Sequence, residues 1–254
     1  MESGFIRTAA FIGFAFLCWV LSDTIGVRAA ARRITIRTED GITLSGMYYE
    51  ASRPSASSGR LEPAGGRRPG PGIVLLHMLG RTHEDWDRAG SRLADAGFAV
   101  VAIDFRGHGA SGGQASEVAA MGLDVRAAKG FLRERPEVAG TILGEAGASI
   151  GANLAVLDAA DDPGVRSIAL LSPGLDYRGL RIEPAMKKFG PRAALLVSST
   201  KDPYSWRSVR QLALIGPGSR EVRLSESIAH GTTLLSRDGD LISALVDWFR
   251  RTLI

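Results

Sequence analysis

The serine at position 149 is the residue of this chain whose surroundings best suit chemistry. It lies in G-A-S-I-G at residues 147–151, after an apolar, β-branched stretch at 141–144 and before an alanine- and leucine-rich stretch at 152–160. We therefore expect a strand, a sharp turn and a helix in succession. Glycines two positions either side of the serine let the strand and the helix pass closely. Such a turn holds a hydroxyl where a base can reach it, so Ser149 is predicted to be a nucleophile.

The same spacing of glycine and serine occurs a second time, at residues 109–113. This second copy follows the apolar stretch 98–105 but leads into G-G-Q-A-S, and two glycines are a poor start for a helix. In a chain with 31 glycines, the pattern carries weight only through its context. Ser111 is therefore predicted to be an ordinary loop serine.

A serine hydroxyl is a weak nucleophile near neutral pH, so it needs a base within hydrogen-bonding reach and a carboxylate that orients the base. The chain has four histidines. His77 and His108 close strand-like stretches ahead of the serine, and His83 lies in a loop. His230 alone follows the serine, in a glycine-flanked loop after the last expected strand. It is predicted to be the base.

Asp202 stands in S-S-T-K-D-P-Y, where the apolar stretch 192–199 ends. It lies between the serine and His230 along the chain, and we predict that it orients the base. Because Pro203 and a helical stretch follow, its alternative role is to cap that helix. Asp176, after the preceding strand, is the rival candidate for the acid.

The negative oxygen of a tetrahedral intermediate needs hydrogen-bond donors of its own. The backbone N–H of Ile150, directly after the nucleophile, is one expected donor. The other is expected from the loop L-L-H-M-L-G-R-T-H-E-D-W, where Met78 is our choice and Leu79 the alternative. These groups imply no metal ion and no organic cofactor.

The elements that must position these groups alternate between strand and helix. Apolar stretches typical of buried strands occupy residues 72–77, 98–105, 141–144, 165–172 and 192–199, and residues 221–225 predict one more strand. Helical patterns occupy residues 86–96, 117–135, 152–160, 205–215 and 240–252. Residues 33–50 predict two further strands joined at Asp40-Gly41, a pair that suits a hairpin turn. The alternation indicates an α/β fold with a mostly parallel central sheet and helices on both faces.

In such sheets, ligands bind beyond the carboxyl ends of the strands, and every group named above falls at such an end. At 254 residues, with 45% hydrophobic and 23% charged residues, the chain is expected to form one domain over residues 30–254. Residues 51–72, rich in Ser, Pro, Gly and Arg, are predicted to be a flexible surface loop within it. The net charge of +4 comes mostly from scattered arginines, without a dense basic run, so no nucleic-acid partner is expected.

Residues 1–29 are predicted to be a secretion signal. A basic residue precedes the apolar run 8–22, and the small residues Val27 and Ala29 stand where a signal peptidase would look for them. That run is shorter than the roughly 20 residues that span a bilayer. The alternative is an uncleaved anchor, with membrane association through residues 8–27. We expect a secreted, periplasmic or envelope location, and cleavage after Ala29 would remove Cys18, the single cysteine.

Six segments, taken in order, resemble those of the serine α/β-hydrolases, close to the dienelactone-hydrolase-like and serine-aminopeptidase-like members. They are TEDGITLSGMYY, LLHMLGRTHEDW, AIDFRGHGASGG, GEAGASIGAN, SSTKDPYSW and IAHGTTLL, and they fall within residues 33–254. The resemblance implies an α/β-hydrolase fold and the chain order serine, acid, histidine, which selects His230. The chain departs from the family where Met78 follows His77 in place of the usual glycine. Its expected nucleophile is a serine, whereas dienelactone hydrolases use cysteine. The substrate of dienelactone hydrolases is therefore not expected here.

The segment between the expected strands 165–172 and 192–199 is too short for a large lid domain. An open site without a deep apolar tunnel suits small or externally presented acyl groups better than long free lipids. We therefore expect a hydrolase that cleaves carboxylic esters of a small-molecule or acyl-bearing substrate through an acyl-enzyme intermediate. A peptidase or an acyltransferase would use the same residues, and a non-catalytic binding protein on the same fold is the third alternative.

Overall fold

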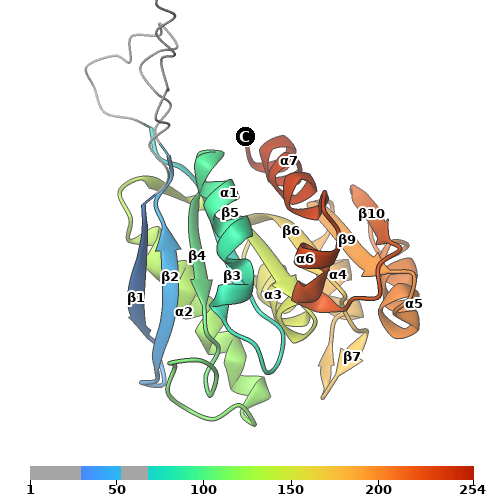
Figure 1. The fold of residues 1–254 in the computed structure, drawn as a ribbon, viewed down its shortest axis with the longest axis horizontal. Helices are drawn as coiled ribbons and strands as arrows, with labels where there is room; N and C mark the ends of the chain where they lie inside the picture. Colours follow the sequence, from blue (N-terminus) through green and yellow to red (C-terminus); the bar gives the residue numbers. More distant parts are fainter. Residues whose placement is uncertain (1–29, 53–67) are drawn as a thin grey trace, which may run out of the picture.

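The computed structural model describes residues 30–52 and 68–254 and contains a central sheet of eight strands. In chain order the strands are β1 (Ala31–Arg37), β2 (Thr43–Tyr49), β3 (Gly70–Leu76), β4 (Ala99–Ile103), β5 (Val138–Ala148), β6 (Val165–Leu171), β9 (Ala193–Ser199) and β10 (Arg220–Ser225). Their order across the sheet is β1-β2-β4-β3-β5-β6-β9-β10 (Figure 1). β2 pairs antiparallel with β1 and with β4, and all the other pairs are parallel. This is the mostly parallel sheet that the sequence predicts.

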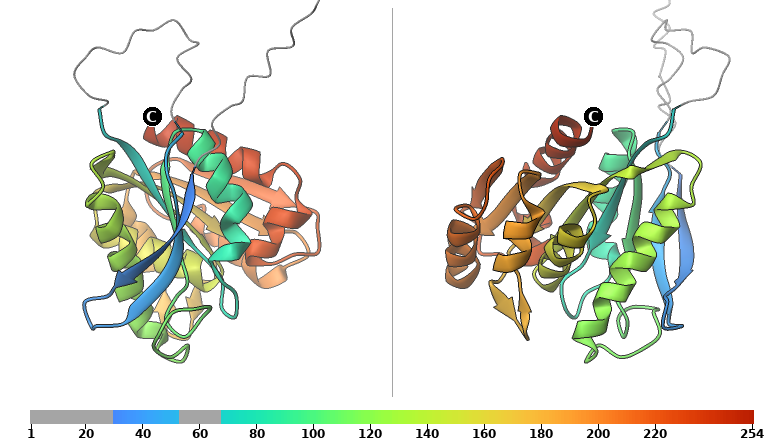
Figure 2. Two further views of the ribbon diagram at one scale, coloured as in Figure 1. Left: turned by 60° about the vertical axis from the view of Figure 1, so that its left-hand side comes forward. Right: turned by 180° about the vertical axis from the view of Figure 1, so that it is seen from behind.

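Helices cover both faces of the sheet (Figures 1 and 2). One face carries α1 (Asp87–Asp95), α6 (Leu234–Arg237) and α7 (Leu241–Leu253). The other carries α2 (Met121–Arg133), α3 (Ile150–Asp161), α4 (Glu183–Phe189) and α5 (Pro203–Leu212). Successive side chains of a strand point to opposite faces, so Val74 of β3 joins one helical layer and Leu75 the other. Both faces of the central strands are therefore buried, which explains their continuous apolar sequence.

Two differences from the predicted element bounds lie at the start of β3 and the start of α1. The strand expected at 72–77 begins at Gly70, within the stretch 51–72 predicted as a loop, of which residues 53–67 lie outside the described residues. The helix expected at 86–96 is preceded by a 3-10 turn, η2 (His83–Trp86). Local composition marks such boundaries weakly, because the pairing of a strand end depends on its neighbours in the sheet.

A third difference concerns β5, which spans Val138–Ala148 where the sequence suggested only 141–144. The strand continues through Gly144, which pairs with Ile73 of β3 and Ser167 of β6, and α7 packs directly over it. A Cβ at that position would lie 2.7 Å from the ring of Phe249. A glycine that reads as a strand breaker in sequence is here the residue that allows close packing on the sheet.

The segment between β6 and β9 forms no large lid. It contains a small antiparallel hairpin, β7 (Asp176–Tyr177) and β8 (Leu180–Arg181), followed by α4. The sequence did not predict this hairpin, because strands of two residues show no hydrophobic periodicity. The space above the carboxyl ends of the strands is therefore only lightly covered.

In residues 30–52 and 68–254, we find no helix with both the length and the apolar character needed to cross a membrane. Residues 1–29, to which the secretion-signal and anchor predictions refer, lie outside the described residues.

Candidate active site

Ser149 occupies the sharp turn between β5 and α3. Its backbone has φ 52° and ψ −116°, a conformation that residues other than glycine rarely adopt. A Cβ at Gly147 would lie 2.1 Å from the carbonyl oxygen of Gly151, and one at Gly151 would lie 2.4 Å from that of Leu76. The two glycines of the motif are therefore required by the close approach of strand and helix, as expected from their spacing.

The structure brings the polar atoms of Ser149, His230 and Asp202 together. Nε2 of His230 lies 2.9 Å from the Ser149 hydroxyl oxygen, and Nδ1 lies 2.5 Å from Oδ2 of Asp202. The hydroxyl can thus donate to Nε2 while Nδ1–H donates to the carboxylate. Such an arrangement could transfer the serine proton to the imidazole during an attack.

The rival acid, Asp176, is engaged elsewhere. Its carboxylate accepts hydrogen bonds from Arg181 at 3.0 Å and from the backbone N–H of Gly179 at 2.9 Å, within the β7–β8 hairpin. The hydrogen bond from Arg181 holds the pKa of Asp176 below its ordinary value. Of the two candidates, Asp202 is therefore the one placed beside His230.

The loop that carries His230 is held by hydrogen bonds within the loop and by one hydrogen bond to η2. The N–H of His230 donates to Oγ1 of Thr233 at 3.0 Å, and the Thr233 hydroxyl donates to the carbonyl of His230 at 2.7 Å. The hydroxyl of Thr232 donates to Asp85, which lies in η2. The histidine loop is therefore tied to the segment that follows β3, where the second oxyanion donor is expected.

His77 controls the start of that segment. Its ring is fully buried, with Nε2 accepting the N–H of Phe105 at 2.9 Å, so the proton sits on Nδ1 and is donated to the carbonyl of Met78 at 2.7 Å. Burial lowers the pKa of His77 to about 4, so the ring is neutral near pH 7. A neutral ring with one donor and one acceptor fixes the orientation of the peptide after Met78.

Met78 and Ile150, the two predicted oxyanion donors, lie where β3 ends and α3 begins. A Cβ at Gly151 would come within 2.6 Å of the carbonyl oxygen of His77, which shows how closely the two segments pass. The N–H of Ile150 belongs to the first turn of α3, whose N–H groups have no acceptor within the helix. The N–H of Ile150 could therefore donate to a ligand.

The Met78 side chain occupies the space above Gly231. A Cβ at Gly231, where φ is +59°, would lie 2.6 Å from the Met78 sulfur. Met78 stands where the family resemblance implied a glycine, and the absence of a side chain at Gly231 makes room for it. The departure from the family pattern is thus compensated next to His230.

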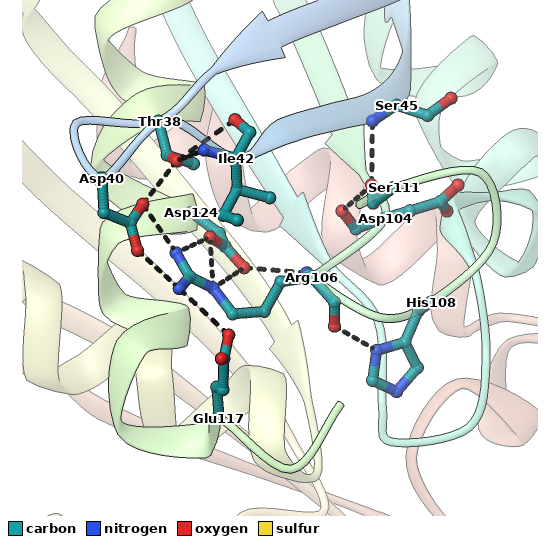
Figure 3. A network of polar contacts seen from close by, with 10 residues as sticks. All are labelled: Thr38, Asp40, Ile42, Ser45, Asp104, Arg106, His108, Ser111, Glu117 and Asp124. Carbon is teal, nitrogen blue, oxygen red and sulfur yellow. Dashed lines mark hydrogen bonds and ion pairs between the residues drawn. The ribbon is translucent and has the colours of Figure 1, made fainter. Parts of the chain in front are cut away.

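Ser111, the serine of the second motif, uses its hydroxyl for structure. It donates to the carbonyl of Asp104 at 2.7 Å and accepts the N–H of Ser45 at 2.8 Å (Figure 3). The bond to Asp104 closes the loop on its own start, and the bond from Ser45 joins the loop to β2. The role of a loop serine, expected from the glycines that follow it, is the one that the geometry supports.

A buried arginine near this loop was not singled out from the sequence. Arg106 is 1% exposed, and its guanidinium contacts Asp124 of α2 and Asp40 of the β1–β2 turn, each at 2.7 Å (Figure 3). The hydrogen bond from Arg106 lowers the pKa of Asp40 to about 2. This network fastens the N-terminal hairpin and α2 to the loop after β4.

His83, placed in a loop by the sequence reading, forms a buried pair with Asp104. Its Nδ1 and its backbone N–H both lie 2.7 Å from Oδ1 of Asp104. The hydrogen bond to Asp104 raises the pKa of His83 above its ordinary value. The pair holds η2, and with it the segment after β3, against the end of β4. His83 and Asp104 lie 21 positions apart, so no local sequence pattern indicates that they pair.

Comparisons with known proteins agree with this architecture. The family described as "Serine aminopeptidase, S33" matches residues 68–233. A solved esterase from Pyrococcus furiosus has a TM-score of 0.71 and 18% identity, over 89% of this chain and 92% of that chain. A dienelactone hydrolase from Anabaena variabilis has a TM-score of 0.70 and 15% identity, and the match covers 89% of this chain and 100% of that chain. A predicted hydrolase from Thermoplasma acidophilum has a TM-score of 0.61 and 20% identity, over 88% and 99%. A search of curated proteins found no match. At these identities, the structural likeness shows a shared fold.

Proposed function

Because this chain belongs to the serine aminopeptidase family and is an α/β-hydrolase, as its motifs suggested, we propose that it cleaves carboxylic esters with Ser149 as nucleophile. The observation that carries the proposal is the pair of contacts made by His230, 2.9 Å to Ser149 and 2.5 Å to Asp202. A serine next to a base that is itself oriented by a carboxylate is the arrangement that acyl transfer requires.

In the proposed reaction, the Ser149 oxygen attacks the acyl carbon while Nε2 of His230 takes the hydroxyl proton. Asp202 accepts Nδ1–H and stabilises the imidazolium that forms. The backbone N–H groups of Ile150 and Met78 donate to the developing oxyanion. The intermediate expels an alkoxide, which His230 protonates, and leaves an acyl group on Ser149. Water, deprotonated by His230, then releases the acid and regenerates the serine.

The candidate site is open to solvent, which favours substrates that approach from the surface of the protein. The His230 side chain is 46% exposed, and residues 173–191 carry only the β7–β8 hairpin and α4. Small or externally presented acyl groups fit such a site better than long free lipids, which need an apolar tunnel. The Pyrococcus furiosus relative is an esterase, which favours ester over amide cleavage here.

A peptidase is the second candidate, and the family description, serine aminopeptidase, is the observation that favours it. Turnover of short esters, long esters and aminoacyl amides under the same conditions distinguishes the two functions. The ester proposal expects the highest kcat/KM for short esters. A clear preference for aminoacyl amides would replace it with the peptidase.

Labelling with a fluorophosphonate probe tests the nucleophile directly. The wild type should be labelled at Ser149, and Ser149→Ala should lose labelling and about 10³-fold or more of its ester turnover. Ser111→Ala is the matched control, because Ser111 lies in the same glycine–serine spacing, and it should be labelled like the wild type. Full activity of Ser149→Ala would rule out the proposal, and an unlabelled, inactive wild type would favour a binding protein.

A further inference from the structure

Among the described residues, three that are not glycine have a left-handed backbone: Ser149 with φ 52°, Ser172 with φ 52° and Arg178 with φ 50°. This conformation is unfavourable for a side chain, and the surrounding structure must compensate for it. Arg178 and Gly179 form the two-residue turn between β7 and β8, where positive φ is required. Ser149 occupies the nucleophile turn. Ser172, directly after β6, lies in no such turn, and its strain needs another explanation.

The contacts of Ser172 point to the two loops of the candidate site. Ser172 is 2% exposed, and its hydroxyl oxygen accepts the N–H of Gly231, the residue after His230, at 2.9 Å. One residue earlier, the carbonyl of Leu171 accepts the N–H of Ser149 at 2.8 Å. A single bend of the chain thus contacts both the residue proposed as nucleophile and the loop that carries the proposed base.

This bend is itself held in place on both sides. The N–H of Ser172 donates to the carbonyl of Val197 in β9 at 2.8 Å. Two residues further on, the buried amide of Asn153 donates to the carbonyl of Gly174 at 2.8 Å and accepts its N–H at 3.1 Å. Asn153 lies in α3, one turn after Ser149. The position of Ser172 relative to the nucleophile turn is therefore fixed by the sheet and by α3.

We propose that Ser172 is a positioning residue, whose hydroxyl holds the His230 loop at the distance at which Nε2 meets Ser149. This inference rests on the proposed function. The Gly231 N–H is buried and needs an acceptor, whereas the other ties of the loop, from Thr232 and Thr233, do not reach β6. A glycine would adopt φ 52° more readily, so the hydroxyl is what a serine contributes at this position.

The variant Ser172→Gly separates positioning from stability. It removes the acceptor and, at the same time, relieves the backbone strain, so the protein should stay folded with a melting temperature near that of the wild type. Because a displaced base is costly to catalysis, kcat for a short p-nitrophenyl ester should fall about 10- to 100-fold. KM should change little, since Ser172 is buried and does not touch the substrate. Arg178→Gly, which relieves the same strain in an exposed turn, should keep the wild-type kcat.

A double-mutant cycle with His230→Ala tests whether the effect passes through the base. In that background, Ser172→Gly should cause no further loss of the residual turnover, although any effect on melting temperature should persist. A folded Ser172→Gly with wild-type kcat would overturn the inference, and so would an equal loss in the His230→Ala background. If Ser172→Gly fails to fold, Ser172→Ala is judged by the same outcomes. Failure of the proposed function would show differently, as a wild type that the fluorophosphonate probe does not label.

Discussion

Asp202 uses its two carboxylate oxygens for two different tasks. Oδ1 accepts the N–H of Ser205 at 3.2 Å and caps α5, whereas Oδ2 lies 2.5 Å from Nδ1 of His230. The two roles weighed from the sequence, helix cap and partner of the base, are thus compatible in one residue. At the residue scale, the capping contact also fixes the carboxylate in the orientation that faces the imidazole.

Asp202→Asn should separate the two tasks. Its side-chain oxygen can still accept from Ser205, so the free energy of unfolding should change by less than about 1 kcal/mol. Its amide would donate to Nδ1 of His230 and favour the wrong tautomer, so kcat should fall by about 10³- to 10⁴-fold. Ester kinetics and urea denaturation measure the two effects. Asp202→Ala, the control, should also lose the cap, and an Asp202→Asn protein with wild-type kcat would contradict the assignment.

His77 makes a pH-dependent contribution to stability. Its pKa is about 4 in the folded protein, against 6.5 for a free histidine side chain. Between these values the unfolded chain binds the extra proton, so stability should fall as the pH drops from about 6.5 to 4, by about 3 kcal/mol in total. His77→Gln should lose stability at pH 7, through weakened hydrogen bonds to Met78 and Phe105, but show a shallower dependence over this window. Urea denaturation at several pH values measures both slopes, and equal slopes would refute the role of His77.

At the scale of elements, β5 shows how glycine can maintain a strand. Gly144 and Gly147 lie inside the strand, and the helices that pack beside them come too close for a side chain. The ring of Phe249 in α7 lies over Gly144, and the backbone of Gly151 in α3 lies beside Gly147. The element that leads to Ser149 is therefore shaped by its neighbours on both faces of the sheet.

Gly144→Ala should destabilise the protein by about 1–3 kcal/mol, because the added methyl would lie 2.7 Å from the Phe249 ring. Gly122→Ala in α2 is the matched control. A Cβ at Gly122 meets no atom within 4 Å, so the same change should stabilise the helix by up to about 1 kcal/mol. Thermal or urea denaturation of both variants provides the test. Similar free energies of unfolding for the two variants would argue against the packing explanation.

At the scale of the whole molecule, the start of the described residues and the candidate site lie at opposite ends of the sheet. Ala31 pairs with Tyr49, which lies beside Val100 at the amino end of β4. Ser149 follows the carboxyl end of β5, and the described chain begins at the far end from it (Figures 1 and 2). Whatever precedes Ala31 therefore joins the domain away from Ser149.

We propose that residues 1–29 direct the chain to secretion and are removed, a proposal supported by the sequence pattern alone. Mass spectrometry of the mature protein should find Ala30 at the amino terminus. Because the segment joins the domain far from Ser149, full-length and mature proteins should hydrolyse a soluble ester with the same kcat/KM within about twofold. An intact Met1 in the membrane fraction would refute cleavage and favour the anchor.

The sequence by itself determined the kind of fold and the residues worth testing. Apolar strands alternating with helical patterns predicted the mostly parallel sheet and its two helical layers. The glycines around Ser149, compared with those around Ser111, distinguished a strand–turn–helix from a loop. These are local signals, since hydrophobic periodicity and backbone sterics act over a few neighbouring residues. The family match and the shared fold confirm the predicted kind of fold.

Only the tertiary structure decided which groups meet. His230 lies 81 positions from Ser149 and 28 from Asp202, and no local pattern encodes those hydrogen bonds. No local pattern encodes the hydrogen bond from the His77 ring to the Met78 carbonyl or the one from the Gly231 N–H to the Ser172 hydroxyl. Nor does one encode the packing of the Met78 side chain over Gly231. Such contacts depend on the register of neighbouring strands and on how the loops beyond them pack. A sequence pattern can name the candidates, but the assembled sheet sets their distances.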